Sequence, residues 1–138
     1  MQLMFAFICR VESKSPDGEM EAVGISFDSI FPPALPALYK EFHLVAKLRG
    51  TMSETGTKRY EVRLIDPDGR NIIEPLEGTF EFGVPAGRLE SYGFLKIRFR
   101  NTLFQAYGPH AARLLVDGVE MADVPFGVER IACANRSA

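Results

Sequence analysis

The clearest fold signal in the chain is the stretch Ala112-Arg113-Leu114-Leu115-Val116-Asp117-Gly118-Val119. Before Asp117, Ala112, Leu114 and Val116 occupy alternate positions, which is the pattern of a strand with one buried face. Asp-Gly then supplies two residues that tolerate the backbone of a tight hairpin turn. The stretch therefore predicts an antiparallel hairpin whose second strand returns from Val119 toward Val128.

The same combination of turn and alternation recurs along the chain. Two further turn sequences, Ser15-Pro16-Asp17-Gly18 and Asp66-Pro67-Asp68-Gly69, lie between apolar runs. Gly, Pro and Asp favour turns for separate physical reasons, so these stretches also predict hairpins. Alternating strands are expected at 23–27, 42–48, 60–64, 80–84 and 95–99. About eight or nine strands with little or no helix predict an all-β fold, an antiparallel two-sheet β-sandwich of the immunoglobulin-like or C2-like kind.

Length and composition fit one globular domain. The 138 residues suffice for a single core, and the apolar share of 46% and charged share of 25% are ordinary for folded proteins. We expect a domain over 1–131 and a flexible tail over 132–138. The formal net charge of -2 provides no long-range field that would attract nucleic acid or a membrane surface.

The N-terminal segment is predicted to be a strand. It is apolar for only about eight residues and lacks the basic start of a secretory signal. No apolar run approaches the roughly 20 residues that span a bilayer. Cys9 and Cys133 lie near opposite ends of the chain, which favours two unpaired thiols in a reducing compartment. We therefore expect a cytoplasmic protein.

Two stretches interrupt the alternating pattern. Three prolines within 30–39 remove ladder donors, so this segment is expected to cross between strands and to pack over one end of the sandwich. The polar, glycine-containing stretch 51–58 is expected to be a mobile loop.

The order of elements resembles a family of short, uncharacterised bacterial β-sandwich proteins that is grouped as a domain of unknown function. The residues that carry the resemblance are the strand beginning at Met1 and the stretches 24–31, 42–50, 62–69 and 114–119, followed by Pro125-Phe126. The resemblance implies the sandwich fold and brings no activity or catalytic residues. At the start of the penultimate strand, Gly108-Pro109-His110-Ala111 stands where the family usually has an aromatic residue.

The sequence assembles no evident catalytic, cofactor or metal site. His43 and His110 are interpreted as surface or edge histidines, since neither they nor the cysteines have the spacing of zinc ligands. Asp66 and Asp68 cannot by themselves supply the six to eight oxygens that Ca²⁺ needs. An enzyme, for example a small hydrolase, is a disfavoured alternative, and no cofactor is expected.

The first strand is apolar on both faces. We expect Leu3, Phe5, Phe7, Cys9 and Val11 to face the core, which leaves Met4, Ala6 and Ile8 on the other side. Such an apolar stripe must be covered, either by the proline-rich crossover or by a second subunit. Met4, Ala6 and Ile8 are therefore candidate self-association residues, and a homodimer is the expected assembly.

A basic row, Lys96, Arg98 and Arg100, occupies alternate positions in the strand expected near 95–99. If the strands carrying Lys47, Arg49 and Arg63 are neighbours, this face could bind an anion or a single nucleic-acid strand, with Tyr92 and Phe94 available for stacking. The favoured interpretation is a solvated face that Glu61, Glu81 and Glu90 neutralise across strands.

The function indicated by the sequence is a non-catalytic binding or assembly module. Self-association or a protein partner is the leading hypothesis, and the anion or single-stranded nucleic-acid binder is the alternative. A membrane partner is not expected.

Overall fold

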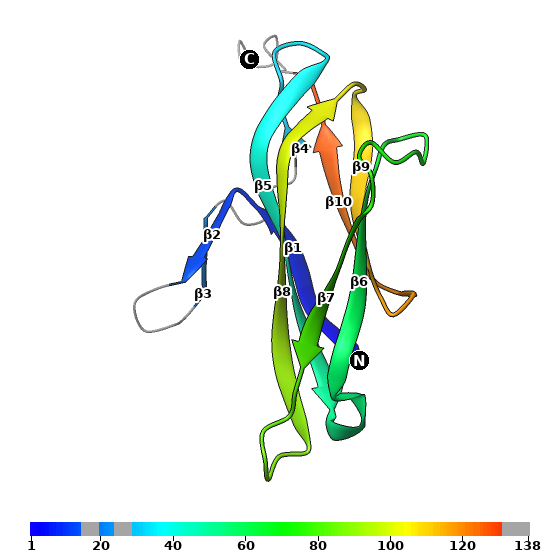
Figure 1. Cartoon of the computed structure of the whole chain (residues 1–138). Coiled ribbons are helices and arrows are strands. Elements are labelled where there is room, and N and C mark those ends of the chain that lie inside the picture. The colour runs from blue at the N-terminus through cyan, green and yellow to red at the C-terminus, as the bar shows by residue number, and fades with distance from the viewer. Residues whose placement is uncertain (15–19, 24–28, 131–138) are drawn as a thin grey trace.

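Figure 1 shows the computed structural model, which describes residues 1–14, 20–23 and 29–130. Eight strands form two sheets that pack against each other, and two more form a small separate hairpin. These described ranges contain no α-helix, and thus no helix long and apolar enough to cross a membrane. The predicted all-β, largely antiparallel two-sheet sandwich is confirmed.

The first sheet has three antiparallel strands in the order β1-β5-β8. They are β1 (Gln2–Cys9), β5 (Ala37–Thr51) and β8 (Glu90–Phe104). The long strands β5 and β8 pair along their whole length, from Ala37 opposite Phe104 to Thr51 opposite Glu90. They run side by side through one layer of the molecule (Figure 1).

The second sheet has five strands in the order β4-β10-β9-β6-β7. They are β4 (Ser29–Ile30), β6 (Gly56–Ile65), β7 (Leu76–Phe82), β9 (Gly108–Val116) and β10 (Val119–Val128). Only the β4–β10 pair in this sheet is parallel. The separate hairpin consists of β2 (Val11–Lys14) and β3 (Met20–Val23), and β2 contacts β5.

The core lies between the two sheets. The rings of Phe42 and Phe99 stack there with centroids 4.7 Å apart, and Phe104 and Phe126 pack on Phe42. The predicted inward faces of β5, β6, β8 and β9 are confirmed, because Leu44, Leu48, Val62, Leu64, Leu95, Ile97, Ala112, Leu114 and Val116 are all buried.

The β9–β10 turn has the conformation that its sequence predicts. Asp117 and Gly118 have φ values of 49° and 80°, the left-handed region that a two-residue hairpin requires. Arg59 of β6 donates its backbone N–H to Oδ1 of Asp117 over 3.0 Å, and Asp117 donates its own N–H to the Arg59 carbonyl over 2.8 Å. The turn is thus also fixed to the neighbouring strand.

The turn at Asp66 is also present, in a longer connection than a hairpin. Oδ1 of Asp66 accepts the backbone N–H groups of Asp68 and Arg70, both over 2.9 Å. The chain then continues over 66–75 before β7 begins at Leu76. The third predicted turn, Ser15-Pro16-Asp17-Gly18, lies outside the described residues.

The two irregular stretches are shorter than expected. The proline-rich crossover covers only 31–36, since β5 already begins at Ala37, and its Leu35 packs against the core. The expected mobile loop at 51–58 is wrong: a 3₁₀ turn, Met52–Glu54, joins β5 to β6. The carboxylate of Glu54 fixes this turn, because it accepts the Thr51 backbone N–H and pairs with the Met1 amine.

The face assignment predicted for the first strand is correct for Leu3, which packs against the core, but it is wrong over 5–8. Ile8 lies opposite Leu44 and Ala6 opposite Ala46, so both face the core, and Ile8 is buried. The register shifts between Leu3 and Phe5, which puts Phe5 opposite Lys47 on the outer face. Because both faces of β1 are apolar, alternation could not distinguish them; pairing with the core face of β5 does.

Candidate functional site

The outer face of the three-stranded sheet gathers aromatic and basic side chains from all three strands. Phe5 lies opposite Lys47 of β5, and Lys47 lies opposite Phe94 of β8. Alternation then directs Phe7 from β1 and Tyr92 from β8 to the same side. We call Phe5, Phe7, Tyr92 and Phe94, together with Lys47 among them, the aromatic patch.

Lys47 is the centre of this patch. Its Nζ lies 4.7 Å from the ring centroid of Tyr92, 5.7 Å from that of Phe94 and 6.0 Å from that of Phe5. Phe5 also stacks on Phe7 with centroids 5.8 Å apart. Tyr92, Phe94 and Phe5 nevertheless stay 48%, 46% and 40% exposed. The patch is an apolar surface around one cation.

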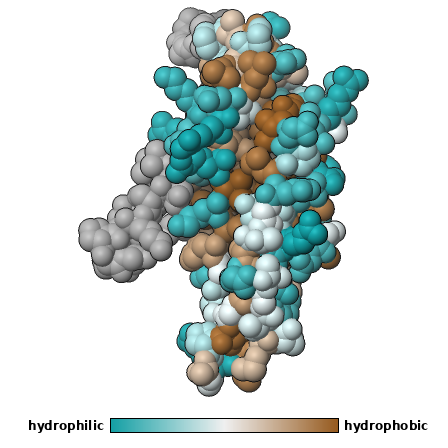
Figure 2. Space-filling model, in the orientation of Figure 1, coloured by the Kyte–Doolittle hydropathy of each residue, from teal (hydrophilic) through white to brown (hydrophobic). Residues whose placement is uncertain are grey.

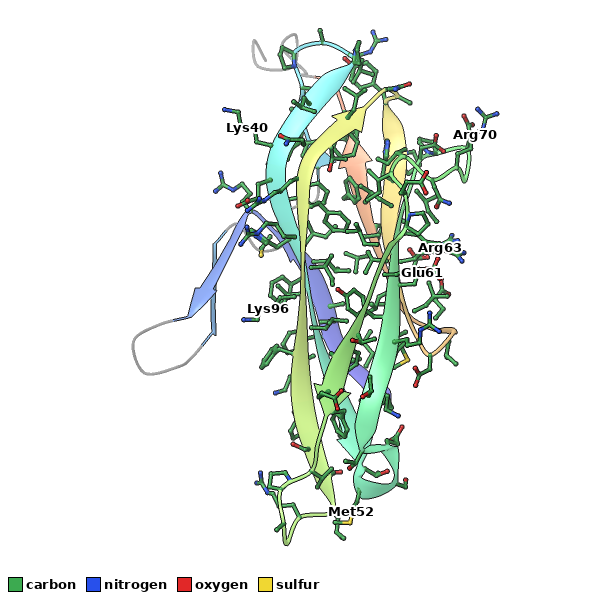
Figure 3. The ribbon with its side chains drawn as sticks, in the orientation of Figure 1. Lys40, Met52, Glu61, Arg63, Arg70 and Lys96 are labelled. Atoms are coloured by element: carbon green, nitrogen blue, oxygen red, sulfur yellow. The ribbon has the colours of Figure 1, made fainter. Side chains whose placement is uncertain are left out.

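The basic row lies on the same face, further along β8. Lys96, Arg98 and Arg100 pair with Val45, His43 and Glu41 of β5. Figure 3 shows the Lys96 side chain pointing away from the space between the sheets. The patch and the basic row thus lie on the same face and follow one another along β8.

Glu41 is the acidic group within the basic row. Its Oε1 lies 3.8 Å from Nε of Arg98 and 3.6 Å from Nε of Arg100, and its Oε2 lies 3.9 Å from Nε2 of His43. Both arginine distances exceed hydrogen-bond range. Two guanidinium groups therefore share one carboxylate.

The charge on this face is positive. Alternation places five basic side chains of β5 and β8 on it, Lys47, Arg49, Lys96, Arg98 and Arg100, and two acidic ones, Glu41 and Glu90, which leaves +3 for these seven described side chains. Of the three predicted counter-ions only Glu90 lies here, 3.0 Å from Arg49. Glu61 and Glu81 lie on the other sheet.

Arg63 does not join the face. It lies on β6 of the five-stranded sheet, and Figure 3 shows it beside Glu61 on the opposite side of the molecule from Lys96. Its Nε donates to Oε1 of Glu61 over 2.9 Å, and this hydrogen bond raises the pKa of Arg63. The expected neighbours Lys47 and Arg49, in contrast, do lie beside β8.

The candidate self-association residues are separated by the structure. Met4 is 42% exposed, whereas Ala6 packs against the core and Ile8 is only 2% exposed. Pairing with β5 directs Phe5 and Phe7 outward, so a contact between copies through β1 would use these two side chains together with Met4. Self-association itself stays a prediction.

Both histidines are buried, so the predicted surface positions are wrong. His110 packs between Phe104 and Phe126, with ring centroids 5.5 and 5.6 Å away, and its Nδ1 lies 2.9 Å from the Gly108 carbonyl. His43 lies on the outer face but is 4% exposed, with Nδ1 3.2 Å from the Arg10 carbonyl. Each histidine side chain is thus buried in the fold with its Nδ1 beside a backbone carbonyl.

The described residues contain no group of three or more His, Cys, Asp or Glu side chains placed to hold a metal ion. A pocket of about 560 Å³ lies over β6, β7 and β9, but neither a histidine nor a cysteine lines it. The Oδ1 atoms of Asp66 and Asp117 accept hydrogen bonds from backbone N–H groups. Cys9 is buried and Cys133 lies outside the described residues, so the state of the thiols stays a prediction.

Sequence reasoning missed two parts of the surface. It did not include Glu41, although Glu41 precedes the alternating apolar run of β5 by one residue and therefore faces outward. It also put Phe5 and Phe7 in the core. The contact of Lys47 with three rings depends on strands far apart in sequence, and no local pattern shows it.

Together these features define a two-sheet β-sandwich with an exposed aromatic and basic sheet face. Residues 4–129 match the family of unknown function DUF6941, and the chain belongs to this family. The resemblance to an uncharacterised β-sandwich family is thereby confirmed. No curated protein matches the chain.

One solved structure to which the chain is distantly similar is that of the Pseudomonas fluorescens alkylpurine DNA glycosylase AlkC bound to DNA containing an abasic site analog. The similarity has a TM-score of 0.40 at 16% sequence identity and covers 75% of this chain. The chain corresponds to 28% of the glycosylase chain. A likeness at this level carries no inference about activity.

Proposed function

We propose that this protein is a non-catalytic binding module that recognises a protein partner through the outer face of its three-stranded sheet. The observation that carries the proposal is the aromatic patch, in which three rings remain two-fifths or more exposed around Lys47. Exposed aromatic side chains beside Met and Arg are the composition of interface centres. Met4, which is 42% exposed, precedes Phe5 in β1, and Arg49 lies opposite Tyr92, so the patch has both beside it.

A protein partner fits this face better than bases would. Stacking of bases needs free ring faces. Lys47 lies within cation–π distance of Tyr92 and Phe94, and Phe5 stacks on Phe7, so contacts within the protein already occupy part of these rings. Glu41 also reduces the positive charge beside Arg98 and Arg100.

The net charge of the face favours an acidic partner over a second copy. In a two-fold dimer this face would meet itself, which brings the net positive charge of these β5 and β8 side chains against its own copy. Such repulsion is screened by salt but opposes docking. The homodimer remains an alternative outcome, with Phe5 and Phe94 as its contact residues.

Affinity capture with two variant proteins tests the proposal. Tyr92→Ser with Phe94→Ser removes the patch, whereas Leu89→Ser with Val119→Ser removes two apolar side chains that are 84% and 60% exposed elsewhere. Proteins retained by the wild type should be lost with the first variant and kept with the second. Equal retention by all three proteins contradicts the proposal.

Sedimentation equilibrium identifies the second copy if it is the partner. A wild-type dimer that becomes a folded monomer on Phe5→Lys with Phe94→Lys would establish self-association through this face. A wild-type monomer directs the search to a different protein.

The anion or single-stranded nucleic-acid binder is the second candidate, because the basic row continues from Tyr92 and Phe94 on the same strand. Salt-dependent binding of a short single strand, lost on Arg98→Glu with Arg100→Glu, would support it. Absence of binding at low salt would exclude it.

A further inference from the structure

One edge of the three-stranded sheet is open. Strand β8 pairs with β5 on one side, and no strand among the described residues pairs with its other side. Every second residue of an antiparallel strand directs its N–H and C=O to the same side. Along β8 these groups form a row of donors and acceptors that an added strand can use.

An apolar groove runs along this open edge. It has a volume of about 380 Å³ and lies between 98–102 of β8 and 73–76, where the β6–β7 connection enters β7. Ile73, Leu76 and Phe99 line it with apolar atoms, and the rest of its lining is polar or charged: Glu74, Arg98, Arg100 and Thr102. Figure 2 shows apolar side chains reaching the surface in a band down the middle of the upper half, with hydrophilic side chains on both sides.

The two faces of this edge differ in chemistry. On the outer face, the side chains of Arg98 and Arg100 are 50% and 63% exposed and share the carboxylate of Glu41. On the inner face lies the apolar groove, with Glu74 in its lining. Arg98 and Arg100 also line the groove, so an acidic side chain is attracted at this edge, but inside the groove it would meet Glu74 as well, whereas on the outer face it would lie beside the two guanidinium groups near Glu41.

We infer that the free edge of β8 binds an extended segment of a partner protein in which acidic and apolar residues alternate. The segment adds a strand beside 95–101. Its apolar side chains enter the groove over Ile73, Leu76 and Phe99, and its acidic side chains lie beside Arg98 and Arg100. This inference rests on the proposed protein-binding function and names the part of the partner that binds.

The same charges select against a second copy at this edge. Pairing two β8 edges would bring arginine side chains against arginine side chains, and like charges on adjacent strands are destabilising. Arg98 and Arg100 thus exclude self-pairing while they attract an acidic strand.

Fluorescence anisotropy with a synthetic peptide tests the inference on the full chain. The probe is a fluorescein-labelled peptide of about seven residues, a typical strand length, in which Glu alternates with Val and both ends are capped. A peptide with Lys in place of Glu is its control. The Glu peptide should bind at low salt and the Lys peptide should not.

Two charge-reversal variants locate the site. Arg98→Glu with Arg100→Glu should weaken binding by about tenfold or more, because it replaces attraction by repulsion at the edge. Arg70→Glu with Arg88→Glu changes the net charge equally at two exposed positions elsewhere, so binding should stay within about twofold. Circular dichroism verifies that both variants fold. Equal losses in the two variants would contradict the inference.

N-methylation of the peptide separates strand addition from charge attraction. All N–H groups of one alternate set of residues point to the same edge of a strand. Methylation of one set should therefore abolish binding, while methylation of the other set should leave it. If neither set matters, or the Glu peptide does not bind at all, the inference is overturned.

A labelled oligothymidylate serves as the competing ligand. One outcome is that the oligothymidylate binds, the Glu peptide does not, and Arg98→Glu with Arg100→Glu abolishes oligothymidylate binding. In that case the edge binds nucleic acid and the inference fails. If the Glu peptide does not bind while affinity capture still depends on Tyr92 and Phe94, the strand-addition inference fails but the proposed protein-binding function stands.

Discussion

The Nζ atom of Lys47 lies 4.7 Å from the centre of the Tyr92 ring, across the pairing of β5 and β8. A cation over a ring face is attracted by the negative charge of that face. The contact therefore fixes the orientation of the Tyr92 ring and keeps an ammonium group within an otherwise apolar surface. It joins two residues that are 45 positions apart in the sequence, about a third of the length of the chain.

A double-mutant cycle measures this contact. Lys47→Met and Tyr92→Leu, alone and together, should show a coupling of about 0.5–1 kcal/mol in the free energy of unfolding, the usual magnitude for an exposed cation–π pair. Urea denaturation of the four proteins provides the values. Additive effects of the two substitutions would show that the contact contributes nothing.

Gly50 is required by close packing. A Cβ at this position would lie 2.7 Å from Cζ of Phe82, which is buried between the sheets. Gly50→Ala should therefore destabilise the fold by about 1–3 kcal/mol, as overpacking of a core does. Gly83→Ala is the matched control, since nothing lies within 4 Å of its added Cβ, and it should change stability by less than about 0.5 kcal/mol. Equal effects in thermal denaturation would contradict this explanation.

Asp117 has two roles that three substitutions separate. Asn retains the side-chain acceptor and tolerates positive φ, Gly retains only the backbone freedom, and Ala retains neither. Stability should fall in the order Asn, Gly, Ala, with Asp117→Ala costing about 1–2 kcal/mol because the Arg59 N–H loses its acceptor. Chemical denaturation gives the order, and an Ala variant as stable as the Asn variant would be inconsistent with it.

Glu54 makes the free energy of unfolding depend on pH in the acidic range. Its hydrogen bond from the Met1 amine, supported by that from the Thr51 N–H, lowers its pKa from 4.5 to about 2. A lowered pKa in the folded state means that the ionised form stabilises the fold above pH 4.5, and that this contribution is lost as the pH falls toward 2.

Glu54→Gln should therefore be less stable than the wild type at neutral pH, and the difference should shrink as the pH falls from 4.5 toward 2. Denaturation curves across this range measure the difference. A difference that stays constant with pH would show that ionisation of Glu54 is not its cause.

Local sequence predicts the strands and their turns well in this chain. Asp117 and Gly118 specify their own turn, and Leu114 and Val116 identify the buried face, because each signal comes from residues close in sequence. His110 lies two residues before Ala112 and therefore on the same buried face. The same alternation thus predicts that His110 is buried, as it is.

Other features depend on pairing between distant strands. Nothing near Phe5 indicates that it faces outward, since the register of β1 against β5 decides this. The same holds for the aromatic patch, which needs β1, β5 and β8 together. The open edge of β8 follows from the strand order of the whole sheet, which alternation within one strand does not contain.

The parallel pairing of β4 with β10 joins Ile30 to Val128, which are 98 positions apart in the sequence. During synthesis, β4 must wait without a partner until nearly the whole domain has left the ribosome. Contacts so distant in sequence slow folding, since the loop between them must be closed first. Completion of the sandwich is therefore a late event, and a nascent chain truncated before Val128 would lack this closure.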